Sequence, residues 1–192
     1  MMIIILYDER RYEDKIGSHR NSRFTETHIM ILTAYTVFHV IISLLGIFSG
    51  FVVLLGLLMG KRLDGWTAFF LISTLATSVT GFFFPVQHFM PSHAIGIISL
   101  LVLALAIYAR YSRVLTGAWR KTYVVSVVLA LYLNVFVAIV QAFRRVPALQ
   151  ALAPAQTEQP FKLAQLSVLA VFVAIGIAAT LRFRPPASNA IA

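Results

Sequence analysis

The chain has 192 residues, of which 59% are hydrophobic and only 12% are charged, and its formal net charge is +9. A water-soluble domain of this size could not cover so much apolar surface, so the composition excludes an ordinary soluble protein. The chain has no cysteine, which excludes disulfides, thiolate nucleophiles and cysteine metal sites. No nucleic-acid-binding motif accompanies the positive charge, so we expect no nucleic-acid partner.

Residues 1–29 differ in composition from the rest of the chain. They hold five of the seven acidic residues. Their apolar run, residues 1–6, is too short for the core of a signal peptide and has no basic residues before it. We therefore predict a disordered N-terminal tail at residues 1–29, with Met30 as an alternative start, and a single transmembrane domain over residues 30–192.

Five apolar stretches follow the tail, each free of Lys, Arg, Asp and Glu and close to the roughly 20 residues that a membrane span needs. They are residues 34–59, 66–85, 93–109, 122–143 and 163–181. This pattern predicts an all-α fold, a polytopic membrane helical bundle of five transmembrane helices embedded in a lipid bilayer. The third stretch is the shortest, and we expect Arg110 at its end to extend its side chain to the membrane surface.

The basic residues are divided unequally between the two sides of such a bundle. One side carries eight: Lys61, Arg62, Arg110, Arg113, Arg120, Lys121, Arg182 and Arg184. The other carries three from Met30 onward: Arg144, Arg145 and Lys162. Basic loops stay in the cytoplasm, which predicts an N-out/C-in orientation. We also expect anionic lipids to bind the cytoplasmic face, and an aromatic belt there that includes Tyr123.

Polar and small residues recur at three- and four-residue spacing on the first four stretches, which is the period of one helix face. They are Thr36, His39, Ser43, Gly46 and Gly50; Thr74, Thr77 and Gly81; Ser92, Gly96 and Ser99; and Asn134 and Gln141. Such faces normally turn inward, so we predict a polar cavity shared by His39, Thr77, Asn134 and Gln141. The fifth stretch has no strong polar stripe and is predicted to be peripheral.

Gly46 and Gly50 form a GxxxG pair, a motif that permits close helix approach. The pair fits tight packing within the bundle. It also fits a dimer face, so a homo-oligomer or a partner in a membrane complex is an alternative.

Three histidines, His39, His88 and His93, are predicted to lie near the outer surface. His39 falls about five residues into the first stretch, where an ionisable side chain is costly without a partner and marks a functional site. Three interpretations stay open. The histidines are hydrogen-bonded structural residues; or His39 and His93 hold haem b, or all three hold a transition metal, with Gly46 or Gly96 leaving space for a flat ring; or they line a polar cavity for a small substrate, quinone or ion.

Catalysis finds little support in the sequence, and we lean toward a protein that is not an enzyme. Beyond the tail, the only carboxylates are Asp64 in a predicted turn and Glu158 in the longest loop. Gly-rich phosphate loops, HExxH and GxSxG are absent. We expect Asp64 to pair with Arg62 or to cap the next helix, and the loop with Glu158 to cover the histidines as a lid or to serve as a solvated connector.

Four stretches of the chain have a recognisable pattern: GKRLDGWTAFFL, TGFFFPVQHFMPSH, LYLNVF and PALQALAPAQTEQPF. Through them the chain resembles a family of small uncharacterised bacterial inner-membrane proteins, over roughly residues 31–184. The resemblance implies a bacterial inner (cytoplasmic) membrane and no particular activity. The sequence thus predicts a multi-pass accessory protein with an outer-facing histidine site; a haem- or metal-binding membrane redox subunit and a small-solute permease component are the alternatives.

Overall fold

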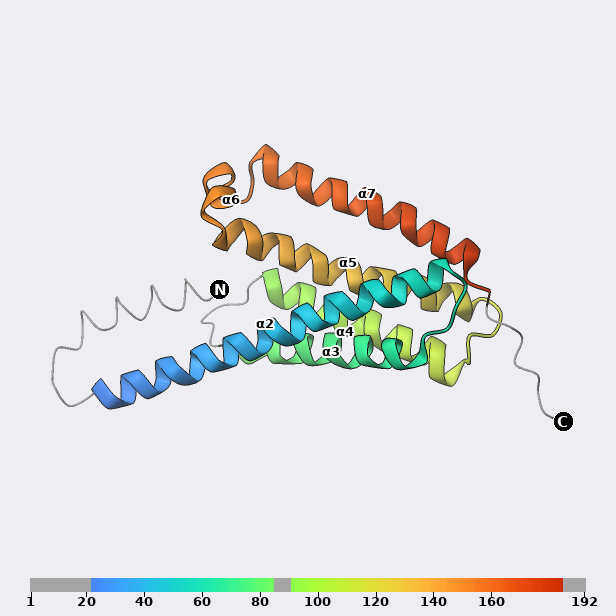
Figure 1. The fold of residues 1–192 in the computed structure, drawn as a ribbon, viewed down its shortest axis with the longest axis horizontal. Helices are drawn as coiled ribbons and strands as arrows, with labels where there is room; N and C mark the ends of the chain where they lie inside the picture. The colour runs from blue at the N-terminus through green and yellow to red at the C-terminus, as the bar shows by residue number, and fades with distance from the viewer. Residues whose placement is uncertain (1–21, 85–90, 185–192) are drawn as a thin grey trace.

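The computed structural model describes residues 22–84 and 91–184, and within these ranges the fold is all-α with no β-strand. In chain order the elements are α2 (Ser22–Leu58), α3 (Asp64–Phe82), α4 (Pro91–Ile107), the π-helix η1 (Tyr108–Ser112), α5 (Trp119–Arg145), the short α6 (Pro147–Leu152) and α7 (Gln159–Arg182) (Figure 1). Each long helix coincides for most of its length with one of the apolar stretches of the sequence.

Five helices in the described ranges are long and apolar enough to cross a membrane. Their spans are Ile29–Leu58, Asp64–Phe82, His93–Ser112, Trp119–Arg145 and Gln159–Arg182. Large apolar side chains such as Ile72, Leu101 and Leu166 are exposed on the outside of the bundle, as expected where lipid replaces water as the solvent. The predicted polytopic bundle of five transmembrane helices is confirmed.

The first helix begins earlier than the sequence predicted. Helix α2 starts at Ser22 and passes through Met30 without a break, so residues 22–29 of the predicted tail are helical in the structure. No Gly or Pro lies between Ser22 and Met30, so nothing in the sequence stops a helix that forms in the apolar span from extending backward. Residues 1–21 of the predicted tail lie outside the described residues.

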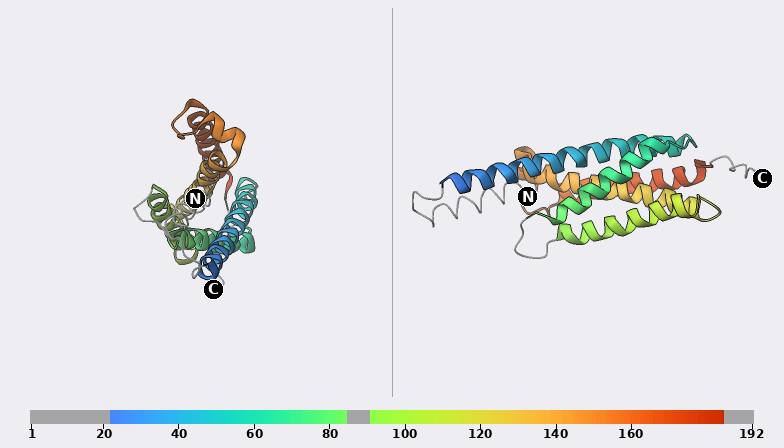
Figure 2. Two further views of the ribbon diagram at one scale, coloured as in Figure 1. Left: turned by 90° about the vertical axis from the view of Figure 1, so that its left-hand side faces the viewer. Right: turned by 90° about the horizontal axis from the view of Figure 1, so that it is seen from below.

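Helix α5 occupies the middle of the bundle and packs against α2, α4 and α7. The end-on view in Figure 2 shows α2, α3 and α4 on one side of α5 and α7 on the other. Only 17% of the apolar window of α7 is buried, against 28% to 39% for the other four spans. The fifth span is therefore peripheral, as its lack of a polar stripe predicted.

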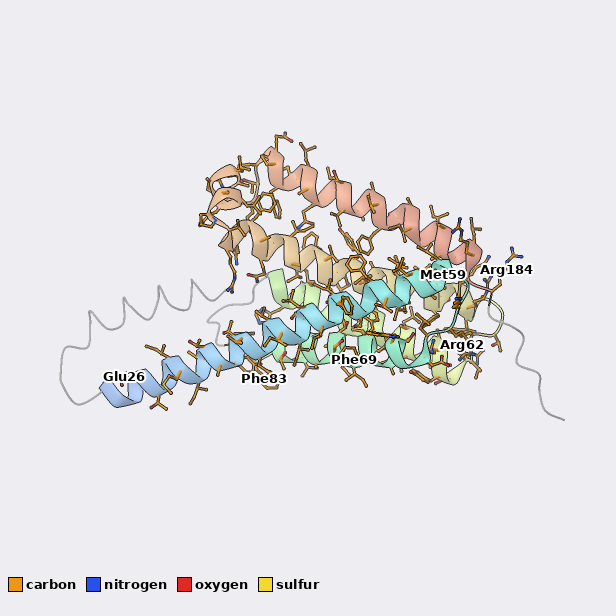
Figure 3. All side chains as sticks on the ribbon, viewed as in Figure 1. Glu26, Met59, Arg62, Phe69, Phe83 and Arg184 are labelled. Carbon is orange, nitrogen blue, oxygen red and sulfur yellow. The ribbon has the colours of Figure 1, made fainter. Side chains whose placement is uncertain are left out.

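The two ends of the bundle carry different elements. The η1 end holds the α2–α3 turn, η1 and the end of α7; the α6 end holds α6, the end of α3 and the start of α7. Figure 3 places Met59, Arg62 and Arg184 together at the η1 end, and Phe83 and Glu26 toward the other. All eight basic residues assigned to one side by the sequence belong to segments at the η1 end.

Helices α2, α3 and α5 meet at Gly50. A Cβ atom there would lie 2.5 Å from Leu131 Cδ1 and 2.8 Å from the Phe70 ring, so any other residue would force these side chains to shift. The GxxxG pair therefore serves packing within the bundle at this position. Beyond Gly50, toward the α6 end, α2 and α5 diverge (Figure 1).

Candidate functional site

A cavity of about 340 Å³ lies where the helices diverge, between α2, α3, α4 and α5 in the α6-end half of the bundle. All four helices contribute polar residues to its wall: Thr36, His39 and Ser43; Thr77 and Ser78; His93 and Ser99; and Asn134, Gln141 and Arg145. Aromatic and aliphatic side chains, Phe82 and Phe84 among them, complete the lining. The volume is at the lower end of the range for small-ligand pockets, about 300 to 1,000 Å³.

The structure brings most of the predicted site residues to this one cavity. His39, His93, Thr77, Asn134 and Gln141 all line it, and each is half-buried. The third histidine proposed as a metal ligand, at position 88, lies outside the described residues. Within the described part of the chain, no group of three His, Cys, Asp or Glu side chains is close enough to hold a metal ion.

His39 is held by Thr80 on the neighbouring helix. Its Nδ1 lies 2.8 Å from Thr80 Oγ1, and Thr80 Oγ1 in turn lies 2.7 Å from the carbonyl oxygen of Ala76. A threonine hydroxyl has one proton, and here the Ala76 carbonyl can only accept it, so we assign Nδ1–H of His39 as the donor to Thr80. The Nε2 atom of a neutral His39 is then a hydrogen-bond acceptor.

Aromatic contacts fix the His39 ring further. The Phe84 ring meets His39 edge-on, with centroids 5.1 Å apart, and meets Tyr35 in the same way at 4.9 Å. The Tyr35 hydroxyl donates to the Thr80 carbonyl at 2.6 Å. Because Thr80 and Phe84 restrain its ring and Tyr35 holds both of them, His39 is oriented before any ligand arrives.

Helix α5 supplies the amide and guanidinium groups of the cavity. Asn134 Nδ2 donates to Thr74 Oγ1 at 3.1 Å, and Arg145 Nε donates to Gln141 Oε1 at 3.3 Å. Neither Asn134 Oδ1, nor the NH2 group of Gln141, nor the terminal nitrogens of Arg145 hydrogen-bond to another described residue. The cavity therefore keeps one amide acceptor and several donors for a ligand.

One residue of the cavity wall, Arg145, and one residue that holds His39, Thr80, were not predicted from the sequence. Arg145 was counted only as a basic residue of a loop, although it follows Gln141 by four positions and so shares its helix face. Thr80 follows Thr77 by three positions and extends the same polar stripe. The helical spacing would have found both.

The glycines that were expected to leave space for a flat ring do not do so. A Cβ atom on Gly96 would lie 3.0 Å from the Phe82 ring, and one on Gly46 would lie 3.3 Å from Ser73 Oγ. His93 packs against the same Phe82 ring at 5.7 Å. These glycines accommodate neighbouring side chains, which leaves the cavity itself as the space for a ligand.

A packed apolar layer closes the cavity toward the η1 end. Phe70, Leu103 and Leu131, from three different helices, are each 0% exposed and lie on the η1 side of the cavity residues along their helices. They belong to the main apolar core of the bundle.

The η1 end holds a second polar cluster, centred on Arg110. The expectation that Arg110 extends to the membrane surface is wrong, since its side chain is only 3% exposed. It donates to the Tyr123 hydroxyl at 2.9 Å and to the carboxylate of Asp64. The π-helix η1 shifts the register of the backbone at this point, and we attribute the inward turn of Arg110 to it.

The partners of Arg110 also differ from expectation. Tyr123, predicted for the aromatic belt, is 1% exposed, and its ring faces the Arg110 guanidinium at 5.3 Å. Asp64 forms the predicted ion pair with Arg62 at 3.5 Å and the additional one with Arg110. It opens α3 without capping it, because no side-chain hydrogen bond caps that helix. The cluster is a set of mutually satisfied groups.

The loop between α6 and α7 is tied down away from the cavity. Glu158 accepts hydrogen bonds from the backbone N–H groups of Ala155 and Thr157, each at 2.9 Å, and these bonds lower the pKa of Glu158 below its ordinary value. Gln156 donates to the Val140 carbonyl at 2.9 Å, which fixes the loop to α5. No residue of α6 or of this loop lines the cavity, so the loop is a connector and not a lid.

Fold and site together define an α-helical polytopic membrane bundle with a polar cavity near its α6 end. Comparison with known proteins finds no matching family model, no matching curated protein and no matching solved structure. No activity is transferred from a relative, so the function is inferred from the cavity.

Proposed function

We propose that the protein is a membrane-bound accessory protein that binds a small organic molecule in the cavity between α2, α3, α4 and α5. The observation that carries the proposal is a set of unfilled hydrogen-bonding groups, contributed by His39, Asn134, Gln141 and Arg145, around one space of about 340 Å³. Polar groups left incomplete within a membrane-spanning bundle are costly unless a ligand or water completes them.

The charges of the cavity favour a ligand with oxygen acceptors. Arg145 is permanently protonated, the NH2 group of Gln141 is a donor, and no carboxylate is among the described lining residues. A carboxylate or a quinone-type carbonyl would accept from both groups. The Phe82 and Phe84 rings in the wall suit the apolar or aromatic body of such a molecule.

The same charges disfavour a metal or haem centre, which is therefore the second candidate. A metal cation in the cavity would be repelled by Arg145 and would find histidine ligands without a carboxylate among the described lining residues. The redox alternative makes its own prediction: protein purified in mild detergent would have a visible absorption band that shifts on reduction with dithionite, or would contain stoichiometric metal.

The permease alternative has less support than binding. A permease needs a continuous polar path, whereas the buried apolar side chains of Phe70, Leu103 and Leu131 lie on the η1 side of the cavity. Transport would require these side chains to separate.

We further propose that the protein lies in a bacterial inner membrane as a member of the resembled family, N-out and C-in, with the cavity facing outward. The support is the grouping of eight basic residues at the η1 end against three at the α6 end. A cytoplasmic reporter fused after Ala192 should be active and a periplasm-dependent one inactive. The reverse result would place the cavity on the cytoplasmic side.

Binding of defined probes tests the function. Benzoate and a water-soluble benzoquinone represent the two acceptor chemistries, and either should raise the thermal unfolding temperature of the purified protein with saturable dependence on concentration. The variant Gln141→Leu should lose that response. The control Gln165→Leu should keep it, because Gln165 is a buried amide between α5 and α7 that lies outside the cavity. Equal responses of the two variants, or none in the native protein, would refute the proposal.

A further inference from the structure

A second hollow, independent of the cavity, runs along the outside of the bundle between α5 and α7. Its volume is about 450 Å³ and its lining is almost entirely apolar. Val125, Val128 and Leu129 form the α5 wall; Leu169, Val173, Ile177 and Leu181 form the α7 wall; Tyr132 and Phe172 also contribute. Gly176 leaves space in the middle, since a Cβ there would touch Val128 at 3.4 Å. We call it the α5–α7 groove.

The groove presents little that would hold a polar ligand. The hydroxyl of Thr180 is used within α7, where it donates to the Gly176 carbonyl at 2.7 Å. Phe172 packs on the Tyr132 ring with centroids 5.7 Å apart. In a membrane-spanning region, hydrocarbon is the chemistry that fits such a surface.

The length and position of the groove match one leaflet of a bilayer. On α7 it extends from Leu169 to Leu181, twelve residue steps of about 1.5 Å each, or roughly 18 Å. Half of a hydrocarbon core of about 30 Å is close to that length. Because α7 ends at Arg182, the groove lies in the leaflet at the η1 end.

Basic side chains lie at the η1 end of the groove. Arg120 donates to the carbonyl of Phe183, which brings the start of α5 and the end of α7 together. Lys121 follows Arg120 and Arg184 follows Phe183, and both are exposed. Lys121 precedes Val125 by four positions and so shares the groove face of α5.

These cations are available to an anion. Among the described residues, Lys121 and Arg184 make no salt bridge, and Asp64, the described acid at this end, is already paired with Arg62 and Arg110. A linear molecule with an acidic head and a long apolar tail matches both the charge and the lining.

We propose that the α5–α7 groove binds one acyl chain of an anionic phospholipid from the leaflet at the η1 end, with the phosphate beside Lys121 and Arg184. This proposal does not depend on whether the cavity binds a ligand. Each basic residue near an anionic lipid contributes about fivefold in affinity, so the headgroup sets the preference and the groove sets the position.

Native mass spectrometry of the full chain, with phosphatidylglycerol and phosphatidylcholine of identical acyl chains added separately, tests the proposal. The native protein should retain one phosphatidylglycerol more strongly than phosphatidylcholine. Val173→Trp, which fills the groove, should lose the retained lipid; Ile177→Trp is the second filling variant in case the first does not fold. Val171→Trp is the matched control, because Val171 is also 54% exposed on α7 but lies outside the groove.

The headgroup is tested separately. Lys121→Gln should lower the retention of phosphatidylglycerol about fivefold and leave phosphatidylcholine unchanged. Equal retention of both lipids by the native protein would overturn the charge preference. Equal loss in Val171→Trp and Val173→Trp would overturn the groove. A protein dimer that Val173→Trp dissociates would instead identify a second copy of the chain as the occupant, and would equally overturn the proposal.

Discussion

The η1 end and the α6 end both enclose polar side chains, yet they treat them in opposite ways. At the η1 end, the buried Arg110 pairs with the buried Tyr123 hydroxyl and with the exposed carboxylate of Asp64. At the α6 end, Asn134 and Gln141 keep hydrogen-bonding groups without partners among the described residues, around an open space. Groups that complete each other stabilise a fold, whereas groups left incomplete beside a cavity are suited to a ligand.

Gly50 lies between the packed η1 end and the cavity of the α6 end. At Gly50, a side chain would overlap Leu131 and Phe70 from the two neighbouring helices; past it, α2 and α5 diverge and the cavity opens. The divergence has a structural cause, because contact at one glycine fixes the crossing point and lets bulkier residues separate the helices farther along. The predictions below test whether the η1 end is structural and the α6 end functional.

The largest effect is expected at Arg110. Arg110→Met should lower the free energy of unfolding by about 2 to 3 kcal/mol, because it leaves the buried Tyr123 hydroxyl without its charged partner; the exposed Asp64 carboxylate adds little to the loss, since it still pairs with Arg62. A denaturant titration in detergent micelles measures the loss. The control is Arg113→Met, whose exposed guanidinium lies over the Trp119 ring at 5.1 Å and should contribute less than about 1 kcal/mol. Similar losses in both variants would mean that the cluster is not structural.

The next effect is expected at the crossing point. Gly50→Ala should cost about 2 kcal/mol, because the new methyl group overlaps Leu131 and Phe70 and forces these buried side chains or their helices to shift. Gly65→Ala is the control, since a Cβ at Gly65 meets nothing within 4 Å and should change stability by less than about 0.5 kcal/mol. The same titration measures both. A neutral Gly50→Ala would show that the helices are free to separate here.

A smaller stability effect, with a larger functional one, is expected in the cavity. Asn134→Leu should cost only about 0.6 kcal/mol, the average for a hydrogen bond within a membrane, and should abolish probe binding. Thr180→Val removes a hydroxyl bond of α7 outside the cavity, so it should have a similarly small cost and leave binding intact. An Asn134→Leu variant that binds normally, or that is as unstable as Arg110→Met, would assign Asn134 to packing.

The sequence predicted the two ends unequally well. The length of the apolar stretches predicted the five helices, and the helical spacing of polar residues predicted that His39, Thr77, Asn134 and Gln141 share one cavity. Each of these predictions depends only on the geometry of single helices. Arg110 could not be predicted in this way. Its inward turn depends on a π-helix, and its partners Asp64 and Tyr123 come from other helices, so the burial of its charge follows from tertiary packing. The sequence showed the GxxxG pair that contains Gly50, but not that Gly50 packs against Leu131 and Phe70.

The smallest effect is expected in the loop that joins α6 to α7. The pKa of Glu158 is lowered because its carboxylate accepts the Ala155 and Thr157 N–H groups, so this contribution is fully present above the ordinary glutamate pKa and is lost as the pH falls through the lowered one. Hydrogen exchange at the two amides, corrected for the intrinsic pH dependence, should speed up over that acidic range. Glu158→Gln should exchange faster at neutral pH as well.

The amide of Gln150 is the internal control for this measurement, because its bond to the Val146 carbonyl involves no titrating group. Its protection should not change with pH or in Glu158→Gln. Probe binding should be unaffected too, since Glu158 lies outside the cavity. If Glu158→Gln instead weakens probe binding, the loop affects the cavity. The interpretation of the loop as a connector without a role in binding would then be wrong.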